Sequence, residues 1–168
     1  MENKSTLRNI ILFYITGILP IFIIFIFSDM FYFFHDIFNL IKNHPAIYSS
    51  KYEEISKLAS NYCKLAPLFA ISMVLFSVKI KNIDLNNVSG NIFLTQVMLL
   101  ITCCLFFYLL YLYNYDLSYG RKIIRIIASN KSSIAIYYMA CFFSAYILTF
   151  SVIIAFIFIP IKKYMNAR

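Results

Sequence analysis

The hydrophobic pattern of this chain is a series of long apolar runs separated by short polar connections. Its longest run, residues 132–161, holds thirty residues without a formal charge. An α-helix rises about 1.5 Å per residue, so about 20 apolar residues cross the hydrocarbon core of a bilayer. The pattern therefore predicts an integral membrane protein whose last span covers about residues 133–161. Because this run exceeds one perpendicular crossing, we expect the helix to tilt or to begin with an interfacial turn.

Earlier runs predict three more spans, over about residues 9–28, 62–80 and 92–113. The first contains Pro20, which a membrane helix tolerates because neighbouring helices can satisfy the backbone carbonyl that proline frees. A kink is therefore expected near Pro20. The third is the clearest of these spans, since Gln96 is its only strongly polar side chain.

The span at 62–80 is the least clear of the four. Only fourteen uncharged residues separate Lys64 from Lys79, and at the helical rise they cover about 21 Å, less than the hydrocarbon thickness. Length alone would permit a re-entrant segment. Lysine stems can reach the head groups while the helix continues, however, so a full crossing is favoured.

Four crossings give an all-α membrane bundle with both termini on one side of the bilayer. Outer loops are then expected at residues 29–61 and 114–132, and an inner loop at 81–91. Within the first outer loop, residues 30–41 carry one apolar helical face. This segment either lies flat in the membrane interface or extends the first helix and packs on the next one. The residues of that face are Phe31, Phe34, Phe38 and Ile41.

The composition agrees with a membrane protein. Hydrophobic residues make up 62% of the 168 positions and charged residues 13%, and the mean hydropathy is +0.78. Average soluble domains carry about 25% charged residues. The net charge of +8 is spread over single and paired basic residues beside apolar runs, so it favours lipid head groups over nucleic acid. The four cysteines lie in or beside apolar spans and predict neither a zinc site nor a disulfide framework.

Orientation follows from where the basic residues lie. With the termini inside, seven lysines and arginines fall on the cytoplasmic side, in short segments next to the spans, and eight fall on the outer side in longer, more acidic loops. The density near the span ends favours cytoplasmic termini. Residues 121–131 then form a basic outer segment that departs from the positive-inside rule. This segment is either functional or held by anionic lipid phosphates.

No predicted span carries an ionisable residue in its middle, which disfavours a pump, a secondary transporter or a charge-selective channel. His35 and His44 stand nine apart without a metal-binding pattern, and the three glycines are too far apart to form a phosphate-binding loop. The sequence therefore predicts no enzyme, no cofactor and no small-molecule substrate. Lateral contact between helices remains, and the alternatives for such a protein include a non-catalytic structural or assembly subunit of a membrane complex. Small residues four apart support helix packing, most simply within the protein's own bundle, at Ala66 with Ala70, Ala140 with Ser144, and Ser151 with Ala155.

Several short sequence motifs in this chain resemble those of a known protein family. The chain reads Ser-Asn-Tyr-Cys-Lys-Leu-Ala-Pro at residues 60–67, at the mouth of the second span, and Pro-Ala-Ile-Tyr-Ser at 45–49. Further words are Asn-Tyr-Asp-Leu at 114–117 and Lys-Ile-Ile-Arg at 122–125, and Pro160 precedes two lysines at the exit of the last span. In order, spacing and total length the chain resembles immunity proteins against pore-forming colicins of the colicin A and colicin B type.

The resemblance implies four transmembrane helices, cytoplasmic termini and residence in the bacterial inner membrane as a multi-pass protein. It also implies that the partner is the pore-forming domain of a cognate colicin, which the protein binds and inactivates as the toxin inserts. Which colicin is recognised, and in what stoichiometry, does not follow from the sequence.

Carried over position by position, the resemblance implies two clusters of partner-binding residues on the outer side, which alternatively stabilise the two loops against each other. The first cluster is Asn61, Tyr62, Lys64, Ala66 and Pro67, and the second is Asp116, Lys122 and Arg125. One departure affects the second cluster. Gly120 stands where relatives place alanine, and Arg121 replaces their following glycine, so this turn is expected to differ in shape.

Overall fold

The computed structural model describes residues 11, 14–27, 32–77 and 92–166, most of them helical. The predicted inner loop, residues 81–91, lies outside these residues, as do the ends of two predicted spans. By length and composition, three of the described helices can cross a membrane, and a bent helix pair near the N-terminus makes four if it counts as one span. This agrees with a mostly helical membrane protein, and four crossings stay a prediction.

The chain begins with a bent pair of helical segments. A π-helical stretch, η1 (Tyr14–Ile18), leads into α2 (Leu19–Phe27), and α3 (Tyr32–Ile41) follows. The axis of α3 lies at 109° to that of residues 14–27. The described part of the predicted segment 30–41, which is α3, therefore does not continue the axis of the first helix. Its apolar face packs against the buried core through Phe34, Ile37, Phe38 and Ile41.

A second helical stretch, residues 50–75, is apolar enough to span a membrane but is interrupted in the middle. A short 3-10 turn, η2 (Ser50–Tyr52), precedes α4 (Glu53–Cys63), and α5 (Ala66–Ser77) follows after a two-residue break. Pro67 accounts for the break, because proline lacks the N–H that a continuous helix requires. The N–H groups of Leu68 and Phe69 both bond to the carbonyl of Leu65, at 3.0 and 3.3 Å.

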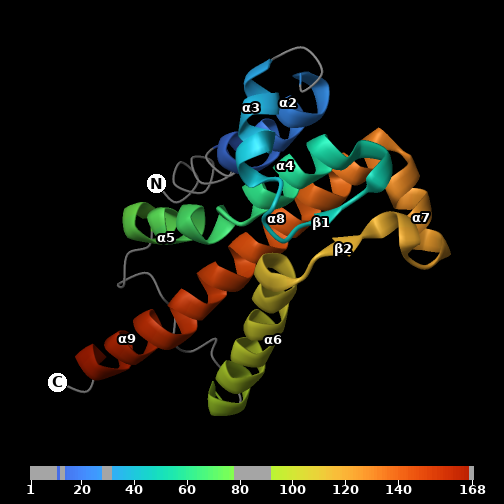
Figure 1. Ribbon diagram of the computed structural model, residues 1–168. Coiled ribbons are helices and arrows are strands. Elements are labelled where there is room, and N and C mark those ends of the chain that lie inside the picture. The colour runs from blue at the N-terminus through green and yellow to red at the C-terminus, as the bar shows by residue number, and fades with distance from the viewer. Residues whose placement is uncertain (1–10, 12–13, 28–31, 78–91, 167–168) are drawn as a thin grey trace.

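The second half of the chain holds the longest helices. They are α6 (Ile92–Leu112), the short α7 (Lys122–Ser129) and α8 (Lys131–Ile153), which continues through a π-helical stretch, η5 (Ile154–Phe158), into α9 (Ile159–Asn166). Residues 93–111 and 131–166 have the length and apolar character of membrane spans. In Figure 1, α6 and α9 both extend toward the bottom of the view, away from α7 at the right.

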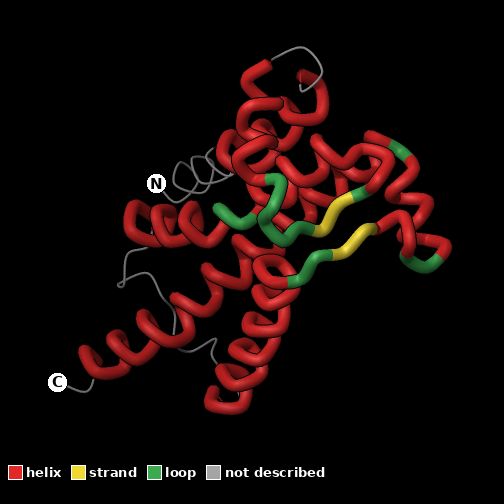
Figure 2. The backbone as a smooth tube through the Cα atoms, viewed as in Figure 1, coloured by secondary structure: helices red, strands yellow, loops and turns green. Residues whose placement is uncertain are grey.

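Two short strands join the predicted outer loops. The strands β1 (Ile47–Tyr48) and β2 (Tyr115–Asp116) pair in parallel, with Ile47 opposite Tyr115 and Tyr48 opposite Asp116. Figure 2 shows both strands side by side in yellow. The N–H of Tyr115 also donates to the carbonyl of Ala46 at 3.1 Å. Segments almost 70 residues apart are therefore held together on one side of the helices.

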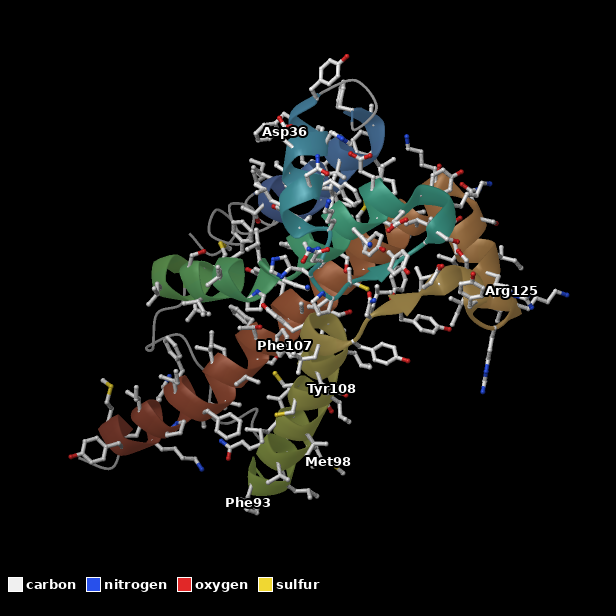
Figure 3. The ribbon with its side chains drawn as sticks, viewed as in Figure 1. Asp36, Phe93, Met98, Phe107, Tyr108 and Arg125 are labelled. Atoms are coloured by element: carbon white, nitrogen blue, oxygen red, sulfur yellow. The ribbon has the colours of Figure 1, made fainter. Side chains whose placement is uncertain are left out.

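The core lies where α2, α4, α5 and α8 meet. Its largest buried side chains include Tyr138 and Phe142 of α8 and Ile21 of α2. Ala66 and Ala70 of α5 are both fully buried, as is Ala145 of α8. Small residues let helices approach closely, which is the main source of helix association in lipid. The first of the three small-residue pairs thus packs within the protein's own bundle. By contrast, α6 exposes most of its apolar side chains, including Phe93, Met98 and Tyr108, as expected for a surface facing lipid (Figure 3).

Candidate partner-binding surface

The two predicted clusters of site residues approach the same side of the molecule, next to the β1–β2 pair. Lys64 shows how the first cluster is tied there. Its ammonium group donates to the carbonyl of Pro45 at 2.6 Å and to the side-chain oxygen of Asn61 at 3.0 Å. The amide of Asn61 donates in turn to the carbonyl of Lys57 at 2.9 Å. Lys64 and Asn61 therefore fix the first outer loop to the break between α4 and α5.

Tyr62 points into the bundle. Its ring stacks on Phe142, with centroids 5.7 Å apart and planes 13° from parallel. Its hydroxyl donates to the backbone carbonyl of Thr16 in η1. Tyr62 therefore connects three helical segments, and its hydroxyl is already used within the protein. Ala66 is fully buried and Pro67 half-buried, so these neighbours shape the helix break and present little surface to a partner.

Asp116 closes the turn after β2, where η4 (Leu117–Tyr119) begins. One carboxylate oxygen accepts the N–H of Ser118 at 2.8 Å and the N–H of Ser50 at 3.1 Å. Partial burial works against the charged form, but the hydrogen bonds from Ser118 and Ser50 outweigh it, so the pKa of Asp116 lies below its ordinary value. The carboxylate of Asp116 thus pins the second outer loop to the first.

Lys122 and Arg125 differ from the other six residues, because their side chains are exposed. Both lie on α7, and Arg125 projects outward at the edge of the molecule in Figure 3. Of the eight predicted residues, these two carry a charge on an exposed side chain. The remaining six are buried or hydrogen-bonded within the loops and helix ends, which agrees with the alternative that they stabilise the loops against each other.

Serine hydroxyls make several of the contacts between and within the outer loops, and the sequence alone did not indicate them. Buried Ser49 donates to the carbonyl of Ala128 at 2.9 Å, and Ser50 donates to the hydroxyl of Ser118 at 2.9 Å. Buried Ser56 accepts the N–H of Ser49 at 3.0 Å. The only signal in the sequence was the serine content of residues 45–60, which is typical of any loop.

Three prolines within the helical stretches share one feature: a carbonyl near each proline accepts a hydrogen bond from another helix. Thr16 lies four residues before Pro20, so its carbonyl faces a residue without an N–H, and Tyr62 of α4 donates to it. At the break before Pro67, the N–H of Leu68 turns to Leu65, and the hydroxyl of Tyr111 of α6 donates to the carbonyl of Lys64. The expectation that a neighbouring helix satisfies the carbonyl at Pro20 is thus confirmed.

The third proline follows the π-helical stretch η5. In this stretch N–H groups bond five residues back, as the N–H of Ile159 does to the carbonyl of Ile154. The next donor in that series would be Pro160, which has no N–H, and its acceptor would be Ala155. Gln96 of α6 donates to that carbonyl at 2.7 Å. Gln96 and Tyr111 are therefore structural donors that sequence reasoning did not assign.

The packing around Gly120 explains why this chain has glycine in the second outer loop where relatives place alanine. A Cβ added at this position would lie 2.7 Å from Cγ2 and 2.8 Å from Cβ of Ile124. Contacts this short are essentially never seen, and the φ of Gly120 is −71°, so packing and not backbone strain requires glycine. The turn from η4 into α7 is consequently tighter than one built around alanine.

One apolar pocket opens beside the first cluster. It has a volume of about 410 Å³, within the range of small-ligand pockets, and lies between α2, α3 and α4. Among the described residues, no three histidine, cysteine, aspartate or glutamate side chains gather where a metal ion could bind. The apolar lining of this pocket suits recognition by direct contact. The pocket is lined by Pro20, Ile23, Ile24, Phe34, Ile37, Ile41, Leu58, Asn61, Tyr62 and Leu65.

Comparison with known proteins gives a consistent answer. The chain is 28% identical over 166 residues to the colicin-A immunity protein of Citrobacter freundii, a match that covers 92% of this chain and 91% of that protein. No solved structure matches the chain. The profile of the family described as colicin immunity protein matches residues 30–168, which is most of the chain and includes both clusters. The protein therefore belongs to the colicin immunity protein family.

Proposed function

We propose that this protein protects its host cell by binding the pore-forming domain of one colicin within the inner membrane and so preventing pore opening. Family membership makes it a colicin immunity protein, and the similarity to a colicin-A immunity protein supports a toxin of that type. The observation that carries the proposal is the outer surface, where two loops are locked together by hydrogen bonds beside membrane-length helices. Such a surface can hold an incoming polypeptide without any reactive group, by complementary contacts.

The proposal includes a topology of four spans with both termini in the cytoplasm. The pairing of β1 with β2 supports it, because the two loops so joined have to lie on the same side of the bilayer. An even number of crossings must then separate residues 48 and 115. In this proposal the two crossings are made by the helical stretches 50–75 and 93–111, which are long and apolar enough to span a membrane.

The eight residues of the two clusters take two roles in this proposal. Lys122 and Arg125 contact the toxin, since their side chains are exposed on the outer side. The other residues act on recognition indirectly, because they hold the loops and the helix break in the shape that the toxin meets. These are Asn61, Tyr62, Lys64, Ala66, Pro67 and Asp116.

The proposal is tested by producing the protein in a colicin-sensitive strain and challenging it with a panel of toxins. Protection against one pore-forming colicin, and none against nuclease colicins, is the expected result. Indifference to every pore-forming colicin, with normal amounts of protein in the membrane, would contradict the proposal and favour a structural subunit of a membrane complex.

Charge-reversal variants then distinguish a residue that contacts the toxin from one that the protein needs for folding. Arg125→Glu should weaken protection at least tenfold in the toxin dose tolerated, with unchanged protein in the membrane. The matched control is Lys163→Glu, an exposed basic residue on α9 at the other end of the molecule, which should retain protection. Lys64→Glu should instead lower both protection and the amount of protein, because it removes the bonds to Pro45 and Asn61.

A further inference from the structure

The short helix α7 carries an exposed apolar ridge. Ile123 and Ile126 are 73% and 59% exposed, and Tyr119 just before the helix is 85% exposed. On the other side of α7, Ala128 is buried and Ile124 and Ile127 are half-buried. Only part of the apolar side of this helix is therefore used for packing within the protein.

The polar side of α7 is basic and lies next to this ridge. At 100° per residue, Lys122, Arg125 and Ser129 share one stripe along the helix, with Ile123 and Ile126 beside it. The helix itself contains no acidic residue. A helix with an apolar side and a basic side is typical of segments that lie in the plane of a membrane that contains anionic lipid.

The position of α7 along the chain sets its depth. The helix ends at Ser129, and the membrane-length stretch 131–166 begins two residues later. A segment this close to the start of a span lies at the height of the lipid head groups. Ser49 and Lys51 also tie the C-terminal turn of α7 to the first loop, through the carbonyls of Ala128 and Ser129 at 2.9 Å each. These bonds fix which side of the helix faces away from the protein.

We infer that α7 is an interfacial anchor: Ile123 and Ile126 enter the boundary of the acyl chains, while Lys122 and Arg125, in a membrane without toxin, bind the phosphates of anionic phospholipids. Charge complementarity selects this occupant, since phosphates are the anions present at that depth. The inference describes the protein in the absence of toxin and requires only that the protein resides in a membrane. It also explains why a basic segment sits on the outer side against the positive-inside rule.

Tryptophan fluorescence tests this inference directly, because the chain contains no tryptophan and one introduced indole is the only one present. The full-length variant Ile123→Trp places the indole on the ridge, and Ser129→Trp places it on the basic stripe as the matched control. Both are reconstituted in phosphatidylcholine vesicles whose acyl chains carry bromine, a contact quencher, with and without phosphatidylglycerol. Helix content by circular dichroism verifies that each variant is folded, and Ile126→Trp serves as a second ridge probe.

The bromolipid should quench the ridge indoles at least threefold more strongly than the control, and aqueous acrylamide should show the opposite order. Phosphatidylglycerol should increase ridge quenching, and combining Ile123→Trp with Lys122→Gln and Arg125→Gln should abolish that increase. Equal quenching at positions 123 and 129 would overturn the inference. So would a ridge indole that acrylamide reaches freely until a protective colicin is added, because the ridge would then belong to the toxin.

Discussion

Single tyrosine hydroxyls join helices of this protein at Pro20 and at Pro67. Tyr62→Phe removes the donor to the carbonyl of Thr16 and keeps the ring stacked on Phe142. We expect a loss of about 1 kcal/mol in the free energy of unfolding, the usual size for a hydrogen bond between membrane helices. Equilibrium unfolding in mixed detergent micelles measures the change. Tyr108→Phe, on the exposed side of α6, is the control and should leave the stability unchanged.

The carboxylate of Asp116 makes the junction between the outer loops sensitive to pH. Because the folded-state pKa of Asp116 lies below the ordinary value of 3.8, its contribution to stability is complete above that value and is lost as the pH falls through the lowered pKa. Asp116→Asn should lose this contribution at neutral pH, and its difference from the unchanged protein should vanish on acidification.

Amide hydrogen exchange at Ser50 and Ser118, whose N–H groups donate to Asp116, measures this effect. Exchange there should be faster in Asp116→Asn at neutral pH and equal in both proteins at low pH. Asp36→Asn, an exposed carboxylate on α3, should exchange at these two positions like the unchanged protein throughout. A difference between the two proteins that persists at the lowest pH would contradict the role assigned to the charge.

At the scale of elements, the π-helical stretch before Pro160 couples α6 to the last helix. Gln96→Leu should cost about 1 kcal/mol of stability, since the carbonyl of Ala155 loses its donor from α6. In a Pro160→Ala background, residue 160 regains an N–H that can serve this carbonyl, so the same substitution should cost less. A double-mutant cycle of unfolding free energies in micelles measures the coupling, which we expect to exceed about 0.5 kcal/mol.

Thr102→Val supplies the control for that cycle. The hydroxyl of Thr102 bonds to the carbonyl of Met98 in its own helix at 2.9 Å, so its effect should add to that of Pro160→Ala. Additivity of Gln96→Leu with Pro160→Ala would mean that Gln96 stabilises the contact between α6 and η5 independently of the proline.

The elements also show what the sequence could and could not predict. The longest apolar runs correspond to α6 and to α8 with α9, since length and hydropathy suffice to define helices that face lipid. Pro67 is a local signal for the break at Lys64, whereas the β1–β2 pair depends on contacts between distant segments. Serine and tyrosine hydroxyls also join distant segments, as Ser49 does with Ala128 and Tyr138 with Ile47. Their acceptors are backbone carbonyls, which every residue offers, so no pattern in the sequence identifies these pairs.

The predicted site residues are of two kinds, those bonded within the protein and those exposed, and the sequence could not distinguish them for the same reason. The family resemblance located both clusters, but the words at 60–67 and 114–117 are the ones whose side chains bond within the protein. Exposure distinguishes Lys122 and Arg125 from them, and exposure follows from the packing of α7, which a short amphipathic sequence does not specify.

For the whole molecule, the side of the membrane on which each end lies is the decisive property. Four spans place α7 outside and the end of α9 inside, although Figure 1 shows only that they lie at different ends of the molecule. Ser129→Cys should react with a membrane-impermeant maleimide in cells whose outer membrane is opened, and Asn166→Cys should react only after the inner membrane is permeabilised, each above the background of the unchanged protein. Labelling of both positions from outside would require an even number of crossings, or none, between them. Since the stretch 131–166 could then not be a single complete span, the four-span topology would be wrong while the pairing of β1 with β2 would still hold.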